Sequence, residues 1–152
     1  MKKILLFILF LPVICFAESS FDAQLKKMKI IDNNYNVIDW DRYNELLRIT
    51  TNNLAPLYPR QTDAYTTILS LTMDRFGINY VYLLKGMESK DQYESFLSDE
   101  DVKEGLKNIS CSPEFVKTEV FRRNKGDSIN IAFVSEKLKP LGQISFSSSD
   151  CY

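Results

Sequence analysis

The sequence predicts an α+β protein with an antiparallel four-stranded sheet, helices packed on one face and one disulfide. Three observations carry this expectation. Two pairs of short runs alternate apolar and polar residues, as half-buried strands do. The segments before and between these pairs repeat apolar residues with the period of a helix. Two cysteines remain once an N-terminal signal is set aside. The length of 152 residues suits one domain.

The first seventeen residues have the order of a secretory signal. Lys2 and Lys3 precede an apolar run from Ile4 to Phe16, and the small residue Ala17 ends it. The run is shorter than the roughly 20 residues that span a bilayer. We expect cleavage after Ala17 and delivery to the periplasm, because a Met-Lys-Lys start is typical of bacterial exported proteins.

Two alternatives to a cleaved, soluble product stay open. Cys15 could carry a lipid anchor, although Ile14 is large for the position before an acylated cysteine. The segment could also remain as an uncleaved membrane anchor. In the main interpretation, residues 18–152 form one small α+β domain without a membrane span. Its residues 18–55 are a helical N-terminal part, and its residues 56–152 are the core.

Cys111 and Cys151 are the cysteines that remain after signal removal. An even pair in an oxidising compartment normally forms a disulfide. Closing a loop of about 40 residues stabilises a fold by about 4 kcal/mol in the chain-entropy model. A redox pair usually has the spacing C-x-x-C, which these two cysteines lack. We therefore expect a structural bridge.

The N-terminal part predicts two helices. Phe21, Leu25 and Met28 follow one another at helical spacings, and Asp39 can cap a longer helix that runs to about Asn52. The apolar face of this second helix would carry Trp40, Tyr43, Leu46 and Leu47.

Two hairpins are expected in the core. Residues 65–73 and 78–84 alternate as strands, and Gly77 in the connection can adopt a positive φ. Residues 128–134 and 143–147 form the second pair, joined by a turn that contains Pro140 and Gly142. Because each pair is joined by a short turn, both are expected to be antiparallel.

Helices are expected between the hairpins. Tyr93 begins one helical pattern, and Ser98 resembles the cap of a helix that ends near Ser110. Pro113 suits the first position of a further helix, which ends at the basic residue Arg123.

With these elements in place, the layout resembles a group of small periplasmic proteins, many of them uncharacterised. The group has a proline-bounded loop, a strand pair, a helix, a cysteine before a second helix, a second strand pair and a final cysteine. The matching pieces are Pro59 to Asp63, Leu69 to Met73, Gly77 to Tyr82, Asn108 to Cys111, Ile144 to Phe146, and Asp150-Cys151. The resemblance covers residues 56–152. It implies a curved sheet with helices on one face, and it implies no catalytic residues.

Composition excludes several functions. The chain has no histidine, which excludes Ser-His-Asp and Cys-His catalysis and histidine-ligated metal sites. Its 19 basic and 20 acidic residues leave no basic excess for nucleic acid. The acidic run from Asp99 to Asp101 suits a helix start, and Asp39 and Asp41 suit helix capping. We expect no catalytic residue, no cofactor and no metal, with a carboxylate-based periplasmic hydrolase as an open alternative.

Aromatic residues give the one functional indication. Tyrosine is enriched in protein interfaces because it is large and has a polar tip. Five tyrosines fall on the first hairpin and its flanks, and they form a candidate partner surface unless they fill the core: Tyr58, Tyr65, Tyr80, Tyr82 and Tyr93. The sequence therefore predicts an exported bacterial envelope protein that binds another exported or envelope protein, as inhibitor, immunity protein or assembly factor. The other alternative is a pilotin-like or structural lipoprotein component of a secretion or conjugation apparatus.

Overall fold

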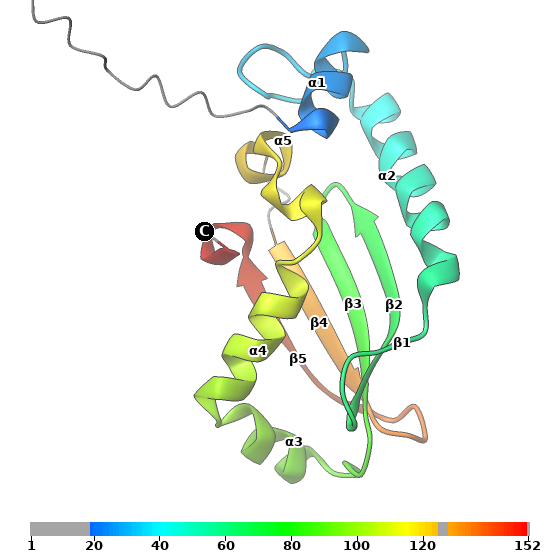
Figure 1. Ribbon diagram of the computed structural model, residues 1–152, viewed down its shortest axis with the longest axis vertical. Helices are drawn as coiled ribbons and strands as arrows, with labels where there is room; N and C mark the ends of the chain where they lie inside the picture. The colour runs from blue at the N-terminus through cyan, green and yellow to red at the C-terminus, as the bar shows by residue number, and fades with distance from the viewer. Residues whose placement is uncertain (1–18, 125–127, 152) are drawn as a thin grey trace, which may run out of the picture.

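The computed structural model describes residues 19–124 and 128–151 (Figure 1). The predicted signal sequence, its cleavage site after Ala17 and the alternative lipid site at Cys15 lie outside these residues. Five strands form one sheet in the order β1-β2-β3-β4-β5. Helices α3 and α4 lie over one face of this sheet, and α2 runs alongside β2.

The bounds of the elements follow the chain order. The strands are β1 (Arg60–Gln61), β2 (Thr66–Asp74), β3 (Gly77–Leu84), β4 (Ser128–Val134) and β5 (Pro140–Ser147). The α-helices are α1 (Ser20–Lys27), α2 (Trp40–Leu54), α3 (Lys90–Leu97), α4 (Glu100–Ser110) and α5 (Glu119–Arg123). Three short 3-10 helices are η1 (Ala55–Leu57), η2 (Glu114–Lys117) and η3 (Ser148–Cys151).

The α+β class and the pairing of both predicted hairpins are confirmed, but Pro140 and Gly142, predicted in the second turn, lie in β5, where they pair with Val134 and Phe133. β2 pairs with β3 and β4 pairs with β5, each antiparallel. The first hairpin closes at the pair Asp74 and Gly77. Gly77 has φ 146°, and a Cβ at this position would collide with the carbonyl oxygen of Ser128 in β4. Glycine is therefore required here both by the turn and by the neighbouring strand.

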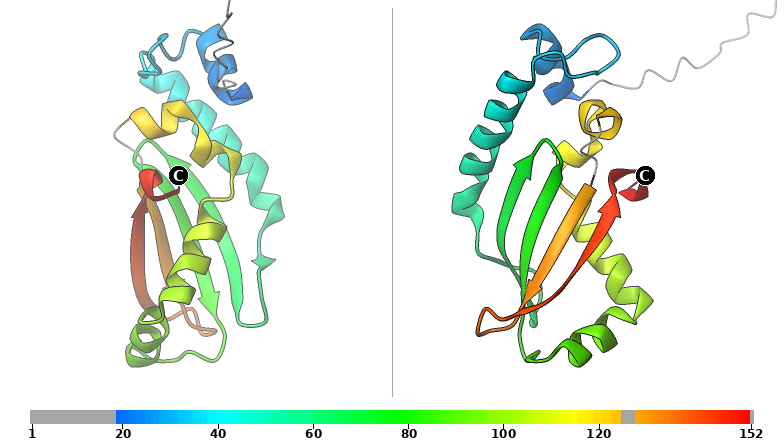
Figure 2. Two further views of the ribbon diagram at one scale, coloured as in Figure 1. Left: turned by 60° about the vertical axis from the view of Figure 1, so that its left-hand side comes forward. Right: turned by 180° about the vertical axis from the view of Figure 1, so that it is seen from behind.

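The expected four-stranded antiparallel sheet is wrong in two respects. The sheet has a fifth, two-residue strand, β1, and its central pair β3–β4 is parallel, with Gly77 opposite Ser128. The segment between β3 and β4 crosses back along the sheet through α3, α4, η2 and α5, so β4 starts at the same end as β3 (Figure 2). Parallel neighbours need such a crossover, whereas local alternation specifies only the hairpin pairs.

The predicted cap of α2 is confirmed, because Asp39 accepts a hydrogen bond from the backbone N–H of Arg42 at 3.1 Å. Tyr43 and Leu47 are buried on the inner face as expected. Trp40 is 41% exposed, contrary to its predicted place on the apolar face. It packs edge-on against Tyr43, with ring centroids 5.9 Å apart, on the solvent side of that ring.

The middle helices begin at other residues than predicted. Ser89 caps α3 with a capping box to Gln92, and Asp99, rather than Ser98, caps α4. The single helix predicted after Pro113 is divided into η2 and α5. Thr118 has extended backbone between them, and its Oγ1 accepts a hydrogen bond from the N–H of Phe121. Thr118 is therefore both the residue that ends η2 and the N-cap of α5.

Asp22 joins the first helix to the last. Its side chain is 1% exposed and accepts hydrogen bonds from the N–H groups of Glu119 at 2.9 Å and Val120 at 3.1 Å. The hydroxyl of Ser19 donates to the same carboxylate at 2.7 Å. Because a buried N–H without a partner costs stability, this carboxylate fixes α1 against α5.

The predicted disulfide is confirmed. Cys111 at the end of α4 is bonded to Cys151 in η3, with the Cα atoms 5.5 Å apart. The bond joins the crossover segment to the residues that follow β5. No helix in the described ranges is long and apolar enough to cross a membrane. The division into residues 18–55 and 56–152 stays a prediction.

Replacing both disulfide cysteines by serine tests the contribution of the bond. The Cys111→Ser/Cys151→Ser variant should lose about 4 kcal/mol of unfolding free energy, because its unfolded chain regains the freedom of a 40-residue loop. Urea unfolding followed by circular dichroism measures the difference. Equal midpoints for the variant and the oxidised protein would contradict the assignment.

Removing the buried carboxylate tests the link between α1 and α5. Asp22→Ala should cost about 2–3 kcal/mol, since two backbone N–H groups lose their acceptor. The matched control is Asp41→Ala, at an exposed position in the first turn of α2. The same unfolding experiment should show a change below about 0.5 kcal/mol for the control. A cost for Asp22→Ala no larger than that of the control would refute the proposed tie.

Candidate functional site

An apolar groove lies between α4 and the η1–β1 segment, on the helix-covered face of the sheet. Its volume is about 610 Å³. The floor is formed by Ile68, Leu71 and Tyr80. One wall contains Leu54, Leu57 and Tyr58, and the other contains Asn108, Ile109 and Pro113. We call this feature the α4 groove.

A smaller hollow of about 200 Å³ continues along the same helix and shares Ile109 with the α4 groove. Phe96, Val102 and Gly105 line it on the helical side. Tyr65, from the loop before β2, lines the other side. The two hollows therefore present apolar surface along most of the length of α4.

The α4 side of these hollows has a gap at its centre. Val102, Gly105 and Ile109 are spaced by three and four residues, so they lie on one face of the helix. Apart from its chain neighbours and the backbone of its own helix, no atom lies within 4 Å of the position that a Cβ on Gly105 would occupy. Packing within the described part of the chain thus gives no reason for a glycine that costs a helix up to about 1 kcal/mol. The space above it admits close approach of another chain.

Charges lie only at the rim of this surface. Arg60 is exposed beside the α4 groove, and Asp63 is exposed beside the smaller hollow. Desolvation raises the pKa of the Asp63 carboxyl, but hydrogen bonds from Tyr65, Thr66 and Thr62 outweigh it and hold the pKa below its usual range. The carboxylate therefore stays ionised at neutral pH and fixes the loop between β1 and β2.

The five predicted tyrosines separate into two groups. Tyr58 lines the α4 groove, and Tyr65 is 70% exposed beside the smaller hollow. Tyr80, Tyr82 and Tyr93 are at most 5% exposed, and Tyr82 and Tyr93 line neither hollow. Only the edge of Tyr80 reaches the floor of the groove.

The three buried tyrosines belong to the core. Tyr80 donates from its hydroxyl to the carbonyl oxygen of Ser110 at 3.2 Å, and Tyr82 shares a hydrogen bond with the Ser110 hydroxyl at 3.4 Å. Burial raises the pKa of Tyr82 to about 12. Tyr93 packs against Phe133 and over Gly142. Positions 80 and 82 alternate onto the covered face of β3, which sequence alternation alone could not distinguish from the open one.

The groove residues that sequence reasoning missed are apolar and widely separated in the chain. Leu57 gives no motif, although it is 63% exposed in the structure. Ile109 gives no signal beyond its place in the helix predicted to end near Ser110. Gly105 was the one visible signal, because a glycine inside a helical pattern calls for a packing or functional reason.

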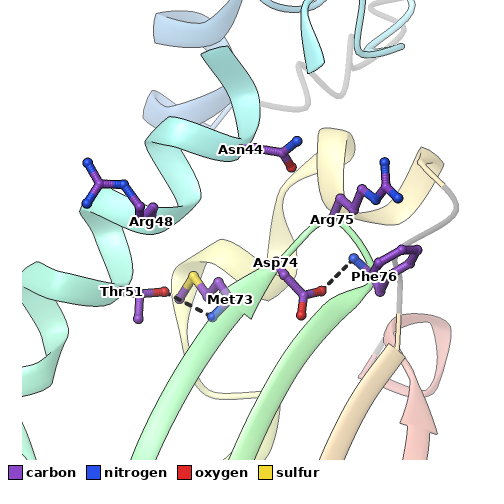
Figure 3. Close-up of a pocket in the computed structure, with 7 residues that line it drawn as sticks. All are labelled: Asn44, Arg48, Thr51, Met73, Asp74, Arg75 and Phe76. Carbon is purple, nitrogen blue, oxygen red and sulfur yellow. Dashed lines mark hydrogen bonds between the residues drawn. The ribbon is translucent and has the colours of Figure 1, made fainter. Parts of the chain in front are cut away.

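A further hollow, of about 390 Å³, lies between α2 and the tip of the β2–β3 hairpin (Figure 3). Its polar groups are engaged. Thr51 accepts a hydrogen bond from the Met73 N–H at 3.0 Å, and Asp74 accepts one from the Phe76 N–H at 2.7 Å. Arg48 is ion-paired with Glu45 on its own helix. The bond between Thr51 and Met73 joins α2 to the hairpin, whereas the other two contacts lie within the hairpin and within α2.

The carboxylates singled out in the sequence lie at helix starts and are not grouped as metal ligands in residues 19–124 and 128–151. No group of three or more cysteine and acidic residues comes together there. Asp39 caps α2, and Asp99 caps α4 through the N–H of Asp101 at 2.9 Å. Asp39 and Asp99 thus cap helices, as their places before α2 and α4 predict.

Comparison with known proteins shows a shared fold and no family. No family model matches the sequence, and no curated protein matches it. A solved structure of a Pseudomonas aeruginosa protein proposed to be secreted aligns with a TM-score of 0.54 at 12% identity, over 76% of this chain and 97% of that one. This similarity shows the fold alone.

Two solved pilotins of type II secretion systems also align. The pilotin from Vibrio vulnificus has a TM-score of 0.41 at 8% identity, and the pilotin from Vibrio cholerae has 0.39 at 12%. Each alignment covers 74% of this chain and 94% of the pilotin. Both TM-scores are below 0.5, so neither alignment carries an argument about function.

Replacing Gly105 by alanine tests whether a contact within the chain requires a glycine at this position of α4. Gly105→Ala should raise the unfolding free energy by about 0.5–1 kcal/mol, because alanine favours the helix and meets no atom. Urea unfolding measures the change. Destabilisation would show that an internal contact requires the glycine.

Proposed function

We propose that this chain is an exported envelope protein that binds a segment of another envelope protein in the α4 groove and carries out no catalysis. The observation that carries the proposal is the groove itself. It is a preformed apolar surface between two walls, with large apolar side chains exposed at its rim. Surfaces of this kind are typical of protein interaction sites.

The chemistry of the groove favours apolar side chains as its occupants. Its floor is aliphatic and aromatic, and Leu54, Leu57, Ile109 and Pro113 line its walls. The polar lining residues can hydrogen-bond the backbone of a bound segment: Arg60, Gln61, Thr62, Asn108 and Ser112.

Location in the envelope is supported by the predicted signal sequence, the disulfide and the fold shared with a protein proposed to be secreted. Inhibition, immunity and assembly are three uses of the same binding site, and the partner decides among them. Lipid on Cys15 in the exported protein would instead favour the pilotin-like lipoprotein alternative, which mass spectrometry of the purified protein detects.

Site-specific cross-linking tests the partner site. A photoreactive amino acid at position 57 should cross-link to one discrete partner in intact cells, because this side chain stands at the rim of the groove. The matched control is position 138, a leucine with 64% exposure against 63% for Leu57, in the turn between β4 and β5. Equal cross-linking from both positions would refute the groove as the binding site.

The partner identified in this way permits a quantitative measurement. Leu57→Asp should weaken binding at least about ten-fold, because it places a charge against an apolar contact, and Leu138→Asp should not. Gly105→Ala should also weaken binding while it stabilises the fold, which separates loss of the site from loss of structure. Isothermal titration of each variant against the partner gives the dissociation constants. Unchanged affinity for Leu57→Asp would contradict the proposal.

A further inference from the structure

The α4 groove has a single charged lining residue, Arg60, which belongs to β1 and is exposed. The opposite wall, formed by α4, contributes only neutral side chains, among them the amide of Asn108. The charged residues of α4 that are closest to Asn108 in the sequence, Glu104 and Lys107, line neither hollow. The lining of the groove therefore carries one positive charge that no other lining residue neutralises.

Arg60 forms no ion pair within residues 19–124 and 128–151. Four other arginines of the chain pair with carboxylates: Arg42, Arg48, Arg122 and Arg123. The remaining one, Arg75, lies over the ring of Phe76, with its guanidinium carbon 4.6 Å from the ring centroid. A guanidinium group offers five N–H donors in a planar arrangement that matches a carboxylate. Arg60 is thus available to a carboxylate that another molecule supplies.

The hydroxyl of Tyr58 is a second donor on the same wall, and it has no hydrogen-bond partner in the described ranges. Partial burial raises the pKa of this hydroxyl, and the nearby positive charge of Arg60 acts against the rise. The hydroxyl therefore keeps its proton at neutral pH. Tyr58 and Arg60 together present donors, one neutral and one charged, to the same part of the groove.

The other polar side chains on this wall and at the end of α4 donate within the chain. Gln61 donates to the carbonyl oxygen of Asp63 at 2.8 Å, and Ser112 donates to that of Ile109 at 2.7 Å. The hydroxyl of Thr62 donates to a backbone carbonyl at the start of β2, at 3.2 Å. The donors left without a partner thus lie around the positive charge. A carboxylate is the protein group that both accepts several hydrogen bonds and carries the opposite charge.

Apolar residues line the surface on both sides of Arg60 in the chain. Leu54 and Leu57 precede it in the α4 groove, and Tyr65 follows it in the smaller hollow. A segment that lies along this surface continues past Arg60 in both directions, so its carboxylate belongs to an interior side chain and not to its C-terminus. The ionised Asp63 is the only charged residue lining the smaller hollow, and it repels a carboxylate there.

We propose that the partner segment bound in the α4 groove is an apolar stretch interrupted by one aspartate or glutamate, whose carboxylate pairs with Arg60 and accepts a hydrogen bond from Tyr58. This inference rests on the function proposed for the groove and names the chemistry of the partner. The apolar side chains supply the contact with the floor, and the carboxylate sets the register of the segment. A segment without the acid would cover Arg60 and leave it unpaired, which disfavours its binding.

Charge reversal at Arg60 tests the proposal, with the partner that position 57 captures in intact cells as the probe. Arg60→Glu should weaken binding about ten-fold or more, because it places two carboxylates together, and Arg60→Gln should weaken it at least about three-fold. The matched control is Arg75→Glu, which reverses an exposed arginine outside both hollows and should bind like the parent. Isothermal titration gives the dissociation constants, and circular dichroism confirms that each variant is folded.

The cross-linked peptide gives a second, independent readout. Mass spectrometry of the peptide joined to position 57 should find one aspartate or glutamate within an apolar stretch, and replacing that acid by its amide should weaken binding to the parent chain but not to Arg60→Gln. A segment without an acid, unchanged affinity for Arg60→Glu, or equal losses for Arg60→Glu and Arg75→Glu would each overturn the inference and leave the groove as the binding site. If position 57 captures no partner, the proposed function fails and this inference fails with it.

Discussion

The parallel pairing of β3 with β4 is the constraint on which the rest of the structure depends. These strands start at the same end of the sheet, so the chain that leaves β3 must return along the sheet before β4 begins. The return path contains α3, α4, η2 and α5. Helices α3 and α4 of this path lie over one face of the sheet, where Tyr80 and Tyr82 are buried and hydrogen-bonded to Ser110 at the end of α4. The position of the α4 groove follows from this single crossover.

Two contacts hold the second half of the crossover in place. The disulfide joins the end of α4 to the residues after β5. Asp22 joins the start of α5 to α1 through two backbone hydrogen bonds. Each contact connects residues far apart in the chain. The disulfide reduces the conformational freedom of the unfolded chain. The Asp22 carboxylate accepts hydrogen bonds from backbone N–H groups that would otherwise lack a partner. The disulfide fixes the C-terminal end of α4, the helix that forms one wall of the α4 groove.

The two faces of the sheet differ in chemistry. The helix-covered face holds the α4 groove, where apolar side chains and the gap at Gly105 suit a closely approaching segment of another protein. On the other face, Asn130 donates a hydrogen bond to Asn79 and accepts one from Ser145, so polar side chains of neighbouring strands bond to each other.

The sequence by itself determined the local features: the α+β class, both hairpins, the Asp39 cap and the bond between Cys111 and Cys151. The class, the hairpins and the cap follow from side-chain alternation and capping, which involve residues close together in the chain. The disulfide follows from the number of cysteines left after signal removal, which requires no knowledge of the fold. Tertiary structure alone decided the parallel central pair, the burial of Tyr80, Tyr82 and Tyr93, and the groove beside α4. The parallel pair depends on the path of the long segment between β3 and β4, which local alternation does not specify. The buried tyrosines and the groove depend on which face of the sheet the helices cover, and alternation distinguishes two faces without indicating which one is covered.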